Sequence, residues 1–236
     1  MRIKLSNRLQ AVAKYVTPGA RVADIGTDHG YLPVYLVVTD LSPRVIAMDR
    51  GKGPLAAAGQ LVSLLSLDTQ IDLRLGDGLA VLQPAEVDVV CIAGMGGMAI
   101  RDILAEGMPV ARSLKRLVLQ PQRNVPAVRN FLVENGWRIV AEDLAEDDGF
   151  YYEIIVAEPG EMALSEEEAE FGPLLLAEGH PLLEDFLLLR QADLTRLLES
   201  MAANNSEESL RRKEQLQGEI ARVAEVIELQ RQRVGK

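Results

Sequence analysis

The fold of this chain is decided by the stretch Asp24-Ile25-Gly26-Thr27-Asp28-His29-Gly30-Tyr31-Leu32. It follows the apolar run Arg21–Ile25, which predicts a buried strand, and leads into Tyr31–Val38, which predicts a helix. A glycine turn between a strand and a helix is the position at which open α/β sheets bind a cofactor. The turn therefore predicts both a parallel sheet and a ligand site at its edge.

Apolar runs and helical patterns alternate on both sides of this turn, as is typical of βαβ units and a parallel sheet. The other parallel strands are predicted at Arg44–Met48, Ile71–Leu75, Val87–Ala93 and Arg116–Gln120. The other helices are predicted after an N-cap at Ser6 and at Gly53–Leu67, Met98–Glu106 and Val125–Asn135.

Two further strands are predicted at Arg138–Leu144 and Phe150–Ala157, joined by the hairpin signal Glu146-Asp147-Asp148-Gly149. An antiparallel pair that finishes a parallel sheet favours the methyltransferase arrangement over the dinucleotide-binding one. The predicted fold class is therefore α/β, with a Rossmann-like seven-stranded methyltransferase sheet.

The composition changes after Pro159-Gly160, where Leu, Glu, Gln and Arg predominate without any strand signal. We expect a catalytic domain at 1–160 and a helical domain at 161–236. Mostly apolar residues recur there at alternating spacings of four and three, at Leu183, Leu187, Arg190, Leu194, Leu197 and Met201 and at Leu216, Ile220, Val223, Ile227, Gln230 and Val234. This pattern predicts a coiled-coil-like hairpin, interrupted at Asn204-Asn205, that packs, dimerises or holds a partner.

Asp28 argues against a dinucleotide and for S-adenosylmethionine. A G-x-G-x-x-G motif starting at Gly26 would need glycine where Asp28 and Tyr31 stand, and a pyrophosphate would meet a carboxylate. S-adenosylmethionine instead carries a sulfonium and an ammonium group, which nearby carboxylates attract. The next two strands also end in acids, with Asp49 suited to the ribose hydroxyls and Asp77 to the adenine amine.

Each acid or glycine taken alone is equally explained as a cap or a tight turn. Their joint position at the ends of consecutive parallel strands favours a cofactor site. The glycine-rich end of the fourth strand lets backbone and ligand approach closely. The predicted cofactor-binding residues are Asp24, Gly26, Thr27, Asp28, His29, Gly30, Tyr31, Asp49, Asp77, Gly78, Ala93, Gly94, Met95 and Gly96.

The sequence also resembles the bacterial tRNA (adenine-N(1))-methyltransferases that modify position 22 of tRNA. The resemblance covers nearly the whole chain and is carried by Leu5–Leu9, Ala23–Pro33, Ala93–Gly97, Leu119–Gln122, Phe150–Ile154 and Phe171–Pro173. It implies S-adenosylmethionine as donor and tRNA as acceptor. One departure is Gln122, where the family pattern leads us to expect Asn. The Asn-Pro-Pro-Tyr-like motif typical of exocyclic amine methylation is absent after the fourth strand.

The target adenine must be accessible or extruded into a pocket. Asp28 is the predicted catalytic residue because a carboxylate stabilises positive charge on the base, unless it only holds the cofactor or caps a helix. The predicted substrate-binding residues are Arg8, Tyr31, Gln120, Gln122, Arg123, Arg129 and Tyr152. Tyr31 and Tyr152 would stack on a base, or else pack against the sheet.

The net charge of −10 is concentrated after residue 160, whereas the first helix and the region Arg101–Arg138 are basic. The predicted phosphate contacts, or else a solvated basic face, are Arg2, Lys4, Arg8, Lys14, Arg112, Lys115, Arg116, Arg123 and Arg129. We expect tRNA as the partner and a monomer or weak homodimer.

The chain has one cysteine, no signal-peptide pattern and no long apolar run, so a cytoplasmic protein without membrane insertion is expected. No metal site is expected. Other RNA, protein or small-molecule acceptors remain alternatives, as does a non-catalytic RNA-binding module. Oxidoreduction with a dinucleotide is disfavoured by Asp28.

Overall fold

The computed structural model describes residues 3–201 and 206–234. Arg2 and the predicted interruption at Asn204-Asn205 lie outside these residues. The chain divides into two compact units, Met1–Leu174 and Leu175–Lys236.

Within the described residues, the first unit contains a seven-stranded sheet in the order β3-β2-β1-β4-β5-β7-β6. Strands β1 to β5 are parallel, and β7 is antiparallel to both β5 and β6. The strands are β1 (Val22–Ile25), β2 (Val45–Asp49), β3 (Ile71–Leu75), β4 (Val89–Met95), β5 (Arg116–Pro121), β6 (Trp137–Asp147) and β7 (Phe150–Pro159). The predicted sheet and its antiparallel finish are confirmed.

The helices of the chain connect these strands and then form its C-terminal part. They are α1 (Asn7–Lys14), α2 (Tyr31–Val38), α3 (Lys52–Leu64), the short 3-10 helix η1 (Gly78–Val81), α4 (Gly97–Glu106), α5 (Met108–Ala111), α6 (Val125–Glu134), α7 (Glu166–Phe171), α8 (Pro173–Glu178), α9 (Leu183–Ser200) and α10 (Glu207–Val234). The short elements η1, α5, α7 and α8 were not predicted, because four to six residues are too few to show a hydrophobic period.

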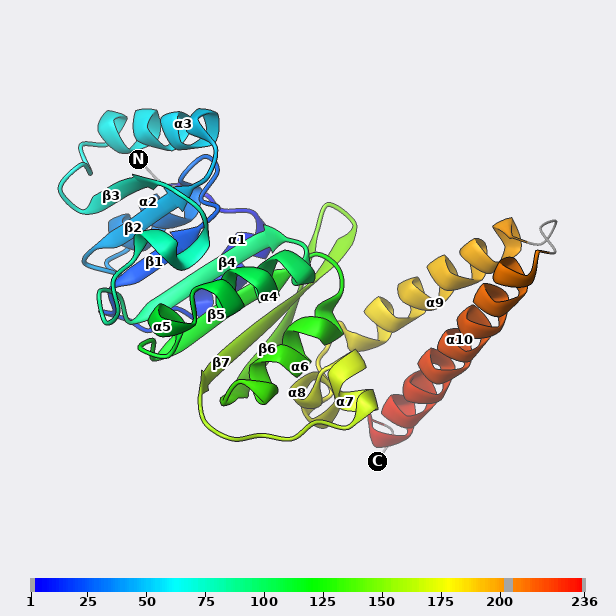
Figure 1. Cartoon of the computed structure of the whole chain (residues 1–236). Helices are drawn as coiled ribbons and strands as arrows, with labels where there is room; N and C mark the ends of the chain where they lie inside the picture. The colour runs from blue at the N-terminus through cyan, green and yellow to red at the C-terminus, as the bar shows by residue number, and fades with distance from the viewer. Residues whose placement is uncertain (1–2, 202–205, 235–236) are drawn as a thin grey trace. The chain divides into compact units, whose positions relative to one another are not determined.

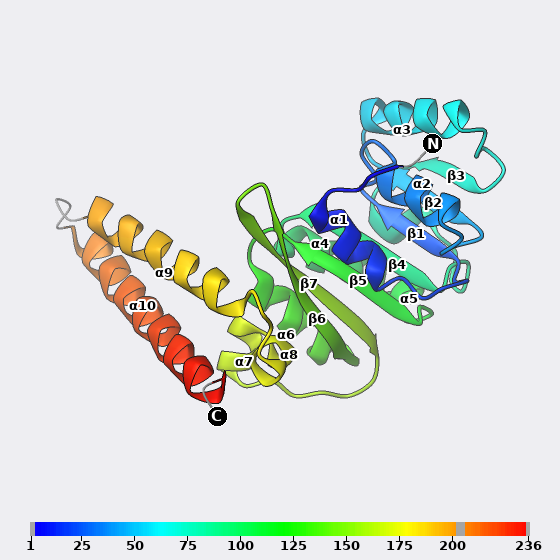
Figure 2. The same cartoon turned by 180° about the vertical axis from the view of Figure 1, so that it is seen from behind.

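Helices cover the sheet on both faces, as Figures 1 and 2 show from opposite sides. Helices α4 and α6 contribute Ile100, Leu104, Val128 and Leu132 to the core on one face. On the other face, α1, α2 and α3 contribute Val12, Ala13, Val34, Leu36 and Val62 to a second core. Strands β1, β2, β4 and β5 are largely buried on both faces, which explains their continuous apolar runs, whereas the edge strand β3 is only partly buried.

The first unit extends to Leu174, beyond the predicted boundary at residue 160. The reason is packing, since Met162, Leu164 and Leu174 lie against the core beneath α4 and α6. Helix α7 begins at a capping box formed by Ser165 and Glu168. The segment after the last strand therefore belongs to the sheet unit.

The second unit consists mainly of α9 and α10, so the predicted helical hairpin is confirmed. The predicted stripe of α10 is buried at Leu216, Val223 and Ile227, whereas Leu197 in the stripe of α9 is 45% exposed. In the described part of the chain, no helix is both long enough and apolar enough to cross a membrane.

Candidate active site

The main cavity of the first unit lies at the carboxyl ends of β1 to β4 and has a volume of about 1020 Å³. Open α/β sheets bind their ligands at this edge. The cavity is lined by every predicted cofactor-binding residue except the buried Gly30, together with Arg8, Gln122 and the start of the chain around α1. The residues that the sequence predicted to bind the cofactor therefore lie around one cavity.

The turn after β1 is held tightly against β2. The backbone N–H groups of Gly26 and Thr27 both donate to the carbonyl of Met48, at 2.8 and 2.9 Å. Gly26 has φ +76°, and a Cβ there would lie 2.1 Å from Cε of Met95. Thr27 is buried, and its hydroxyl lies close enough to the carboxyl of Asp24 to lower the pKa of that acid.

Asp24, the penultimate residue of β1, lies at the floor of the cavity and is only 4% exposed. Burial raises the pKa of its carboxyl from 3.8 to about 6, because the charged form loses its hydration. A cationic ligand would restore the stability of the charged form. The acid is thus placed to respond to the charge of whatever fills the cavity.

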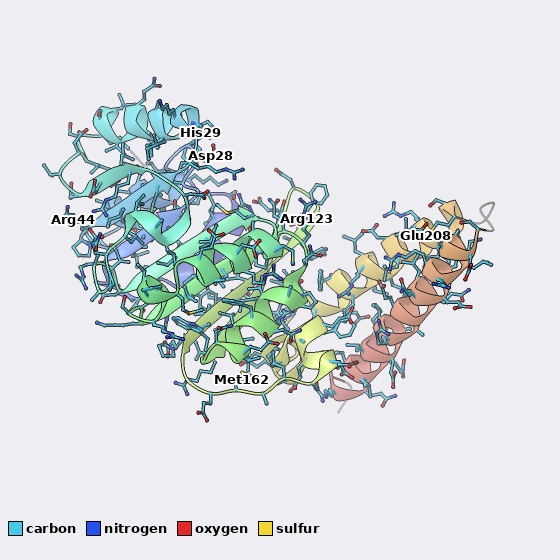
Figure 3. The ribbon with its side chains drawn as sticks, in the orientation of Figure 1. Asp28, His29, Arg44, Arg123, Met162 and Glu208 are labelled. Carbon is cyan, nitrogen blue, oxygen red and sulfur yellow. The ribbon has the colours of Figure 1, made fainter. Side chains whose placement is uncertain are left out.

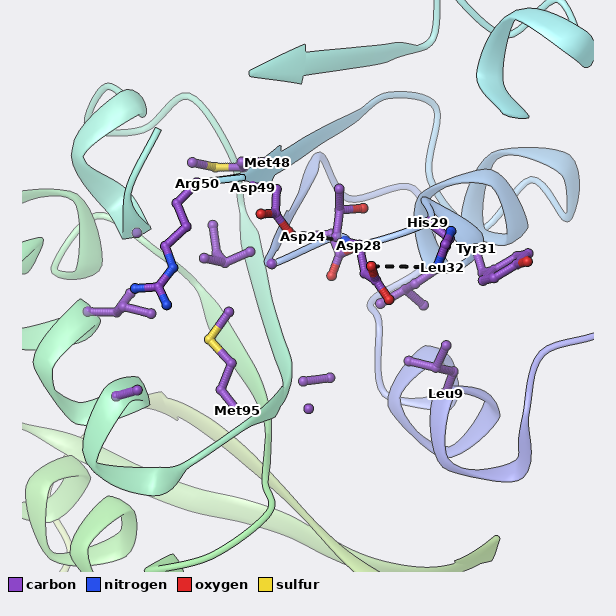
Figure 4. Close-up of a pocket in the computed structure, with 18 of the residues that line it drawn as sticks. Leu9, Asp24, Asp28, His29, Tyr31, Leu32, Met48, Asp49, Arg50 and Met95 are labelled. Atoms are coloured by element: carbon purple, nitrogen blue, oxygen red, sulfur yellow. Dashed lines mark hydrogen bonds and ion pairs between the residues drawn. The ribbon is translucent and has the colours of Figure 1, made fainter. Parts of the chain in front are cut away.

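Asp49, at the end of β2, is oriented by the backbone of two turns. Its Oδ1 accepts a hydrogen bond of 2.7 Å from the N–H of Gly51, and its Oδ2 accepts one of 3.3 Å from the N–H of Asp28. Figure 4 shows Asp24, Asp28 and Asp49 grouped at the ends of β1 and β2, with Met95 reaching toward them from β4. The three carboxylates give the cavity an anionic wall.

Asp28 itself has φ +51° and an exposed side chain, whose Oδ1 lies 3.7 Å from Nε2 of His29. The ring of His29 lies 5.8 Å from that of Tyr31, which is 49% exposed. These three side chains stand at the mouth of the cavity on the turn that leads into α2. They are accessible to a macromolecular substrate.

The ends of β3 and β4 complete the cavity. Asp77 precedes η1 and has no cap hydrogen bond there, and Gly78 has φ +51°. Gly97 begins α4, where its N–H donates to the carbonyl of Arg123 at 2.7 Å. A Cβ on Gly97 would lie 2.4 Å from the carbonyl oxygen of Asn124, so only glycine permits this approach of the two loops.

The base-contacting role predicted for Gln120 is wrong, because its amide is completely buried. Its Oε1 accepts hydrogen bonds from Nη1 of Arg8 at 2.8 Å and from the N–H of Gly94 at 3.0 Å, and its Nε2 donates to the carbonyl of Pro121. Gln122 and Arg123, which follow on the same loop, are exposed. Figure 3 shows Asp28 and His29 after β1 and Arg123 after β5.

The predicted tRNA contact by Arg129 is also wrong. This side chain is 0% exposed and bonds Oε1 of Glu142 at 2.7 Å and Oε2 of Glu153 at 2.6 Å. It also donates to the carbonyls of Ala169 and Glu170. Burial disfavours the charge, but the two glutamates outweigh this effect and raise the pKa of the guanidinium. Arg129 ties α7 to β6 and β7.

Four other predicted phosphate contacts lie away from the cavity. Lys14 bonds Asp143, Lys115 bonds Asp88, and Arg116 bonds Glu158. Lys115 and Arg116 precede or begin β5, and Arg112 caps α5 just before them, so these residues belong to the amino-terminal edge of the sheet. Of the basic residues on and before α1, Lys4 and Arg8 line the cavity.

Arg50, Asp102 and Glu106 also line the cavity and were not predicted. The sequence contained a signal for Asp102 and Glu106, because residues four positions apart in a predicted helix lie on the same face. Among residues 3–201 and 206–234, no cluster of three or more His, Cys, Asp or Glu side chains is placed to hold a metal ion.

The strand order and the acid-walled cavity at the carboxyl edge define the class of this protein as a Rossmann-like methyltransferase. A family profile described as tRNA (adenine(22)-N(1))-methyltransferase matches residues 22–225. The chain belongs to this family.

Individual relatives agree with this assignment. The Bacillus subtilis tRNA (adenine(22)-N(1))-methyltransferase is 41% identical over 159 residues, which cover 67% of each chain. The crystal structure of the B. subtilis tRNA methyltransferase TrmK has a TM-score of 0.85 at 33% identity, covering 96% of this chain and 100% of that one. A Streptococcus pneumoniae protein solved in complex with S-adenosyl-L-methionine has a TM-score of 0.85 at 35% identity, covering 95% of this chain and 100% of that one.

Proposed function

We propose that this protein methylates N1 of adenine 22 in tRNA, with S-adenosylmethionine as the methyl donor. The observation that carries the proposal is the cavity lined by the carboxylates of Asp24 and Asp49, with Asp28 at its mouth, in a chain of this family. Carboxylates suit a ligand with sulfonium and ammonium groups and would repel a pyrophosphate.

We assign the cofactor roles by position in the cavity. Asp24, on the floor, would face the ammonium group of the methionine part. Asp49 would accept hydrogen bonds from the ribose hydroxyls, because backbone N–H groups already fix its carboxylate. Asp77 would lie toward the adenine. The Met95 side chain, which fills the space above Gly26, would pack on the ligand.

When bound, S-adenosylmethionine supplies a methyl group on a positively charged sulfur, and its transfer to adenine N1 moves the positive charge onto the base. Asp28 is exposed at the cavity mouth and would stabilise that charge. Tyr31 would stack on the extruded adenine. Lys4 and Arg123 would attract the tRNA backbone to this side of the sheet. We place the reaction in the cytoplasm, where tRNA is modified.

The direct test is incubation of the protein with unmodified tRNA and methyl-labelled donor, followed by digestion and nucleoside mapping. We expect label in 1-methyladenosine at position 22 and none in a transcript with guanosine at that position. Label at another nucleoside, in protein or in a small molecule would contradict the proposal.

The cavity floor also predicts that cofactor binding depends on pH. Asp24 has a pKa of about 6 in the free protein, and a bound cation would lower it. Below pH 6, binding must then release a proton, so affinity should rise with pH by up to about tenfold per unit and level off above pH 6. Calorimetric titration between pH 5 and 7.5 measures this. The Asp24→Asn variant should lose this rise of cofactor affinity between pH 5 and 6. If the rise is unchanged in the variant, another group must release the proton.

The raised pKa of Asp24 also makes the stability of the free protein depend on pH, and this stability falls as the pH rises, whereas cofactor affinity increases. The folded protein holds the Asp24 proton more tightly than the unfolded chain, whose pKa is 3.8. The resulting stabilisation of the free protein is fully present below pH 3.8 and is lost as the pH rises through about 6. Cofactor binding and free-protein stability should therefore respond to pH in opposite directions.

A further inference from the structure

We propose that Gln120 is a positioning residue that holds Arg8 at the cavity so that its guanidinium binds a phosphate of the target nucleotide or of its neighbour. The inference rests on the proposed function, because it takes tRNA as the substrate. It goes further by naming the group that Arg8 recognises and the residues that orient Arg8. None of these residues is adjacent to another in the sequence.

Gln120 joins two elements of the cavity through one oxygen atom. Its Oε1 accepts from Nη1 of Arg8 on α1 and from the N–H of Gly94 at the end of β4, at 2.8 and 3.0 Å. Its Nε2 donates to the carbonyl of Pro121 at 3.1 Å, which fixes which end of the amide faces Arg8. A completely buried amide with these partners orients the guanidinium and the turn together.

Arg8 is held from two further directions. Its guanidinium lies 5.6 Å from the centre of the Tyr152 ring, a cation–π distance. Its backbone N–H donates to Oδ2 of Asp147 at 3.3 Å, on the hairpin between β6 and β7. An arginine restrained in this way loses less conformational freedom when it binds an anion.

The guanidinium forms no salt bridge with a described carboxylate, although Asp24 and Asp147 are near enough to interact with its charge. Among the described residues, no carboxylate forms a salt bridge with Arg8, whereas Arg21, Arg74, Arg116 and Arg129 all have acidic partners. Nη1 lies 3.4 Å from the position that a Cβ on Gly94 would take, and Arg8 lines the cavity. The Arg8 guanidinium therefore has N–H groups left to donate to an anion beside the bound base.

A phosphodiester is the anion that the chemistry favours. The adenine is neutral and the donor is cationic overall, but the carboxylate of its methionine part is a competing anion for Arg8. A nucleotide inserted into the cavity brings its own phosphates to the rim, and the affinity for the donor distinguishes the two anions. Arginine binds phosphate through paired N–H donors. The competing role is electrostatic, because the positive charge of Arg8 also favours the ionised form of Asp24.

The test compares Arg8→Met, Gln120→Met and the double variant by kinetics and by tRNA binding at several salt concentrations. We expect Arg8→Met to raise the KM for tRNA about tenfold to a hundredfold and to reduce the salt slope of binding by about one. Gln120→Met should show a smaller change of the same kind. The double variant should be no worse than Arg8→Met, because Gln120 acts through Arg8.

The dissociation constant for S-adenosylmethionine should stay within about twofold of the parent in the single variants, since Arg8 is assigned to the tRNA. Gln120→Glu would pair the charge of Arg8 with a buried carboxylate and remove the donor to the carbonyl of Pro121, so it should not restore the tRNA affinity. If Gln120→Met does not fold, Tyr152→Leu removes the ring beneath the guanidinium and tests the same restraint. Arg112→Met, at the other edge of the sheet, is the matched control for loss of one exposed arginine.

An unchanged KM and salt slope in Arg8→Met would overturn the inference, as would effects of Arg8 and Gln120 that multiply in the double variant. A weakened cofactor affinity without a tRNA effect would assign Arg8 to the carboxylate of the donor or to Asp24 instead. These results leave methyl transfer by the parent protein intact. If the parent protein transfers no methyl group to tRNA, the proposed function itself fails.

Discussion

The Asp28→Asn variant is expected to transfer methyl groups roughly 100-fold more slowly than the parent, with little change in stability or in cofactor affinity. The substitution removes the negative charge at the cavity mouth and keeps the shape of the side chain. Asn is the appropriate replacement because Asp28 has φ +51°, a conformation that Asn adopts more readily than Ala. The backbone N–H that donates to Asp49 is retained. Single-turnover methylation of tRNA at saturating donor measures the chemical step.

Two controls separate charge stabilisation from cofactor binding. Calorimetry with S-adenosylmethionine should give similar affinities for parent and variant, whereas Asp49→Asn should weaken binding of the donor. Near-parental turnover of Asp28→Asn would exclude Asp28 as a catalytic residue. A loss confined to donor affinity would make it a cofactor-binding residue only.

The Arg129→Met variant is expected to lose about 3–5 kcal/mol of unfolding free energy, because Glu142 and Glu153 would remain buried without their cation. The carbonyls of Ala169 and Glu170 would also lose donors. Denaturant unfolding of the whole chain measures the change. This loss would be a large part of the stability of a typical domain, so expression of the folded variant should fall.

Arg112→Met provides the matched comparison, since Arg112 is exposed and should change stability by less than about 0.5 kcal/mol. A small loss in Arg129→Met as well would mean that the ion pairs contribute little beyond the apolar stem. A substitution at Gly172 would disturb the same ion pairs, because a Cβ there would lie 2.8 Å from both Arg129 and Glu142. Its φ of +90° makes Gly172→Ala strained in addition.

Much of the fold was predictable because local pattern and tertiary environment agree. The parallel strands other than the edge strand β3 are buried on both faces, so each of them appears in the sequence as an apolar run followed by a turn, as at Asp24 and Asp49. The hairpin signal at residues 146–149 predicted the antiparallel finish. Strand ends of a parallel sheet meet at one edge, so the acids after β1, β2 and β3 could be placed together before any coordinates.

The positions of the basic side chains were not predictable in the same way. Arg8, Arg116 and Arg129 look alike in the sequence, yet one faces the cavity, one pairs with Glu158 and one is buried between two glutamates. The partners of Arg129 lie on β6 and β7, and those of Arg116 lie on β7 and at the end of α1. A charge count along the chain cannot register partners that are remote in sequence.

The sequence alone thus determined the sheet, its cofactor edge and the family, because each depends on local periodicity and on residue types in consecutive turns. Only the tertiary structure decided which polar side chains are available to a ligand. It buried Gln120 and Arg129, left Arg8 and Asp28 at the cavity, and raised the pKa of Asp24 to about 6. The physical reason is that burial and pairing are set by segments far apart in the chain, which come together only when the protein folds.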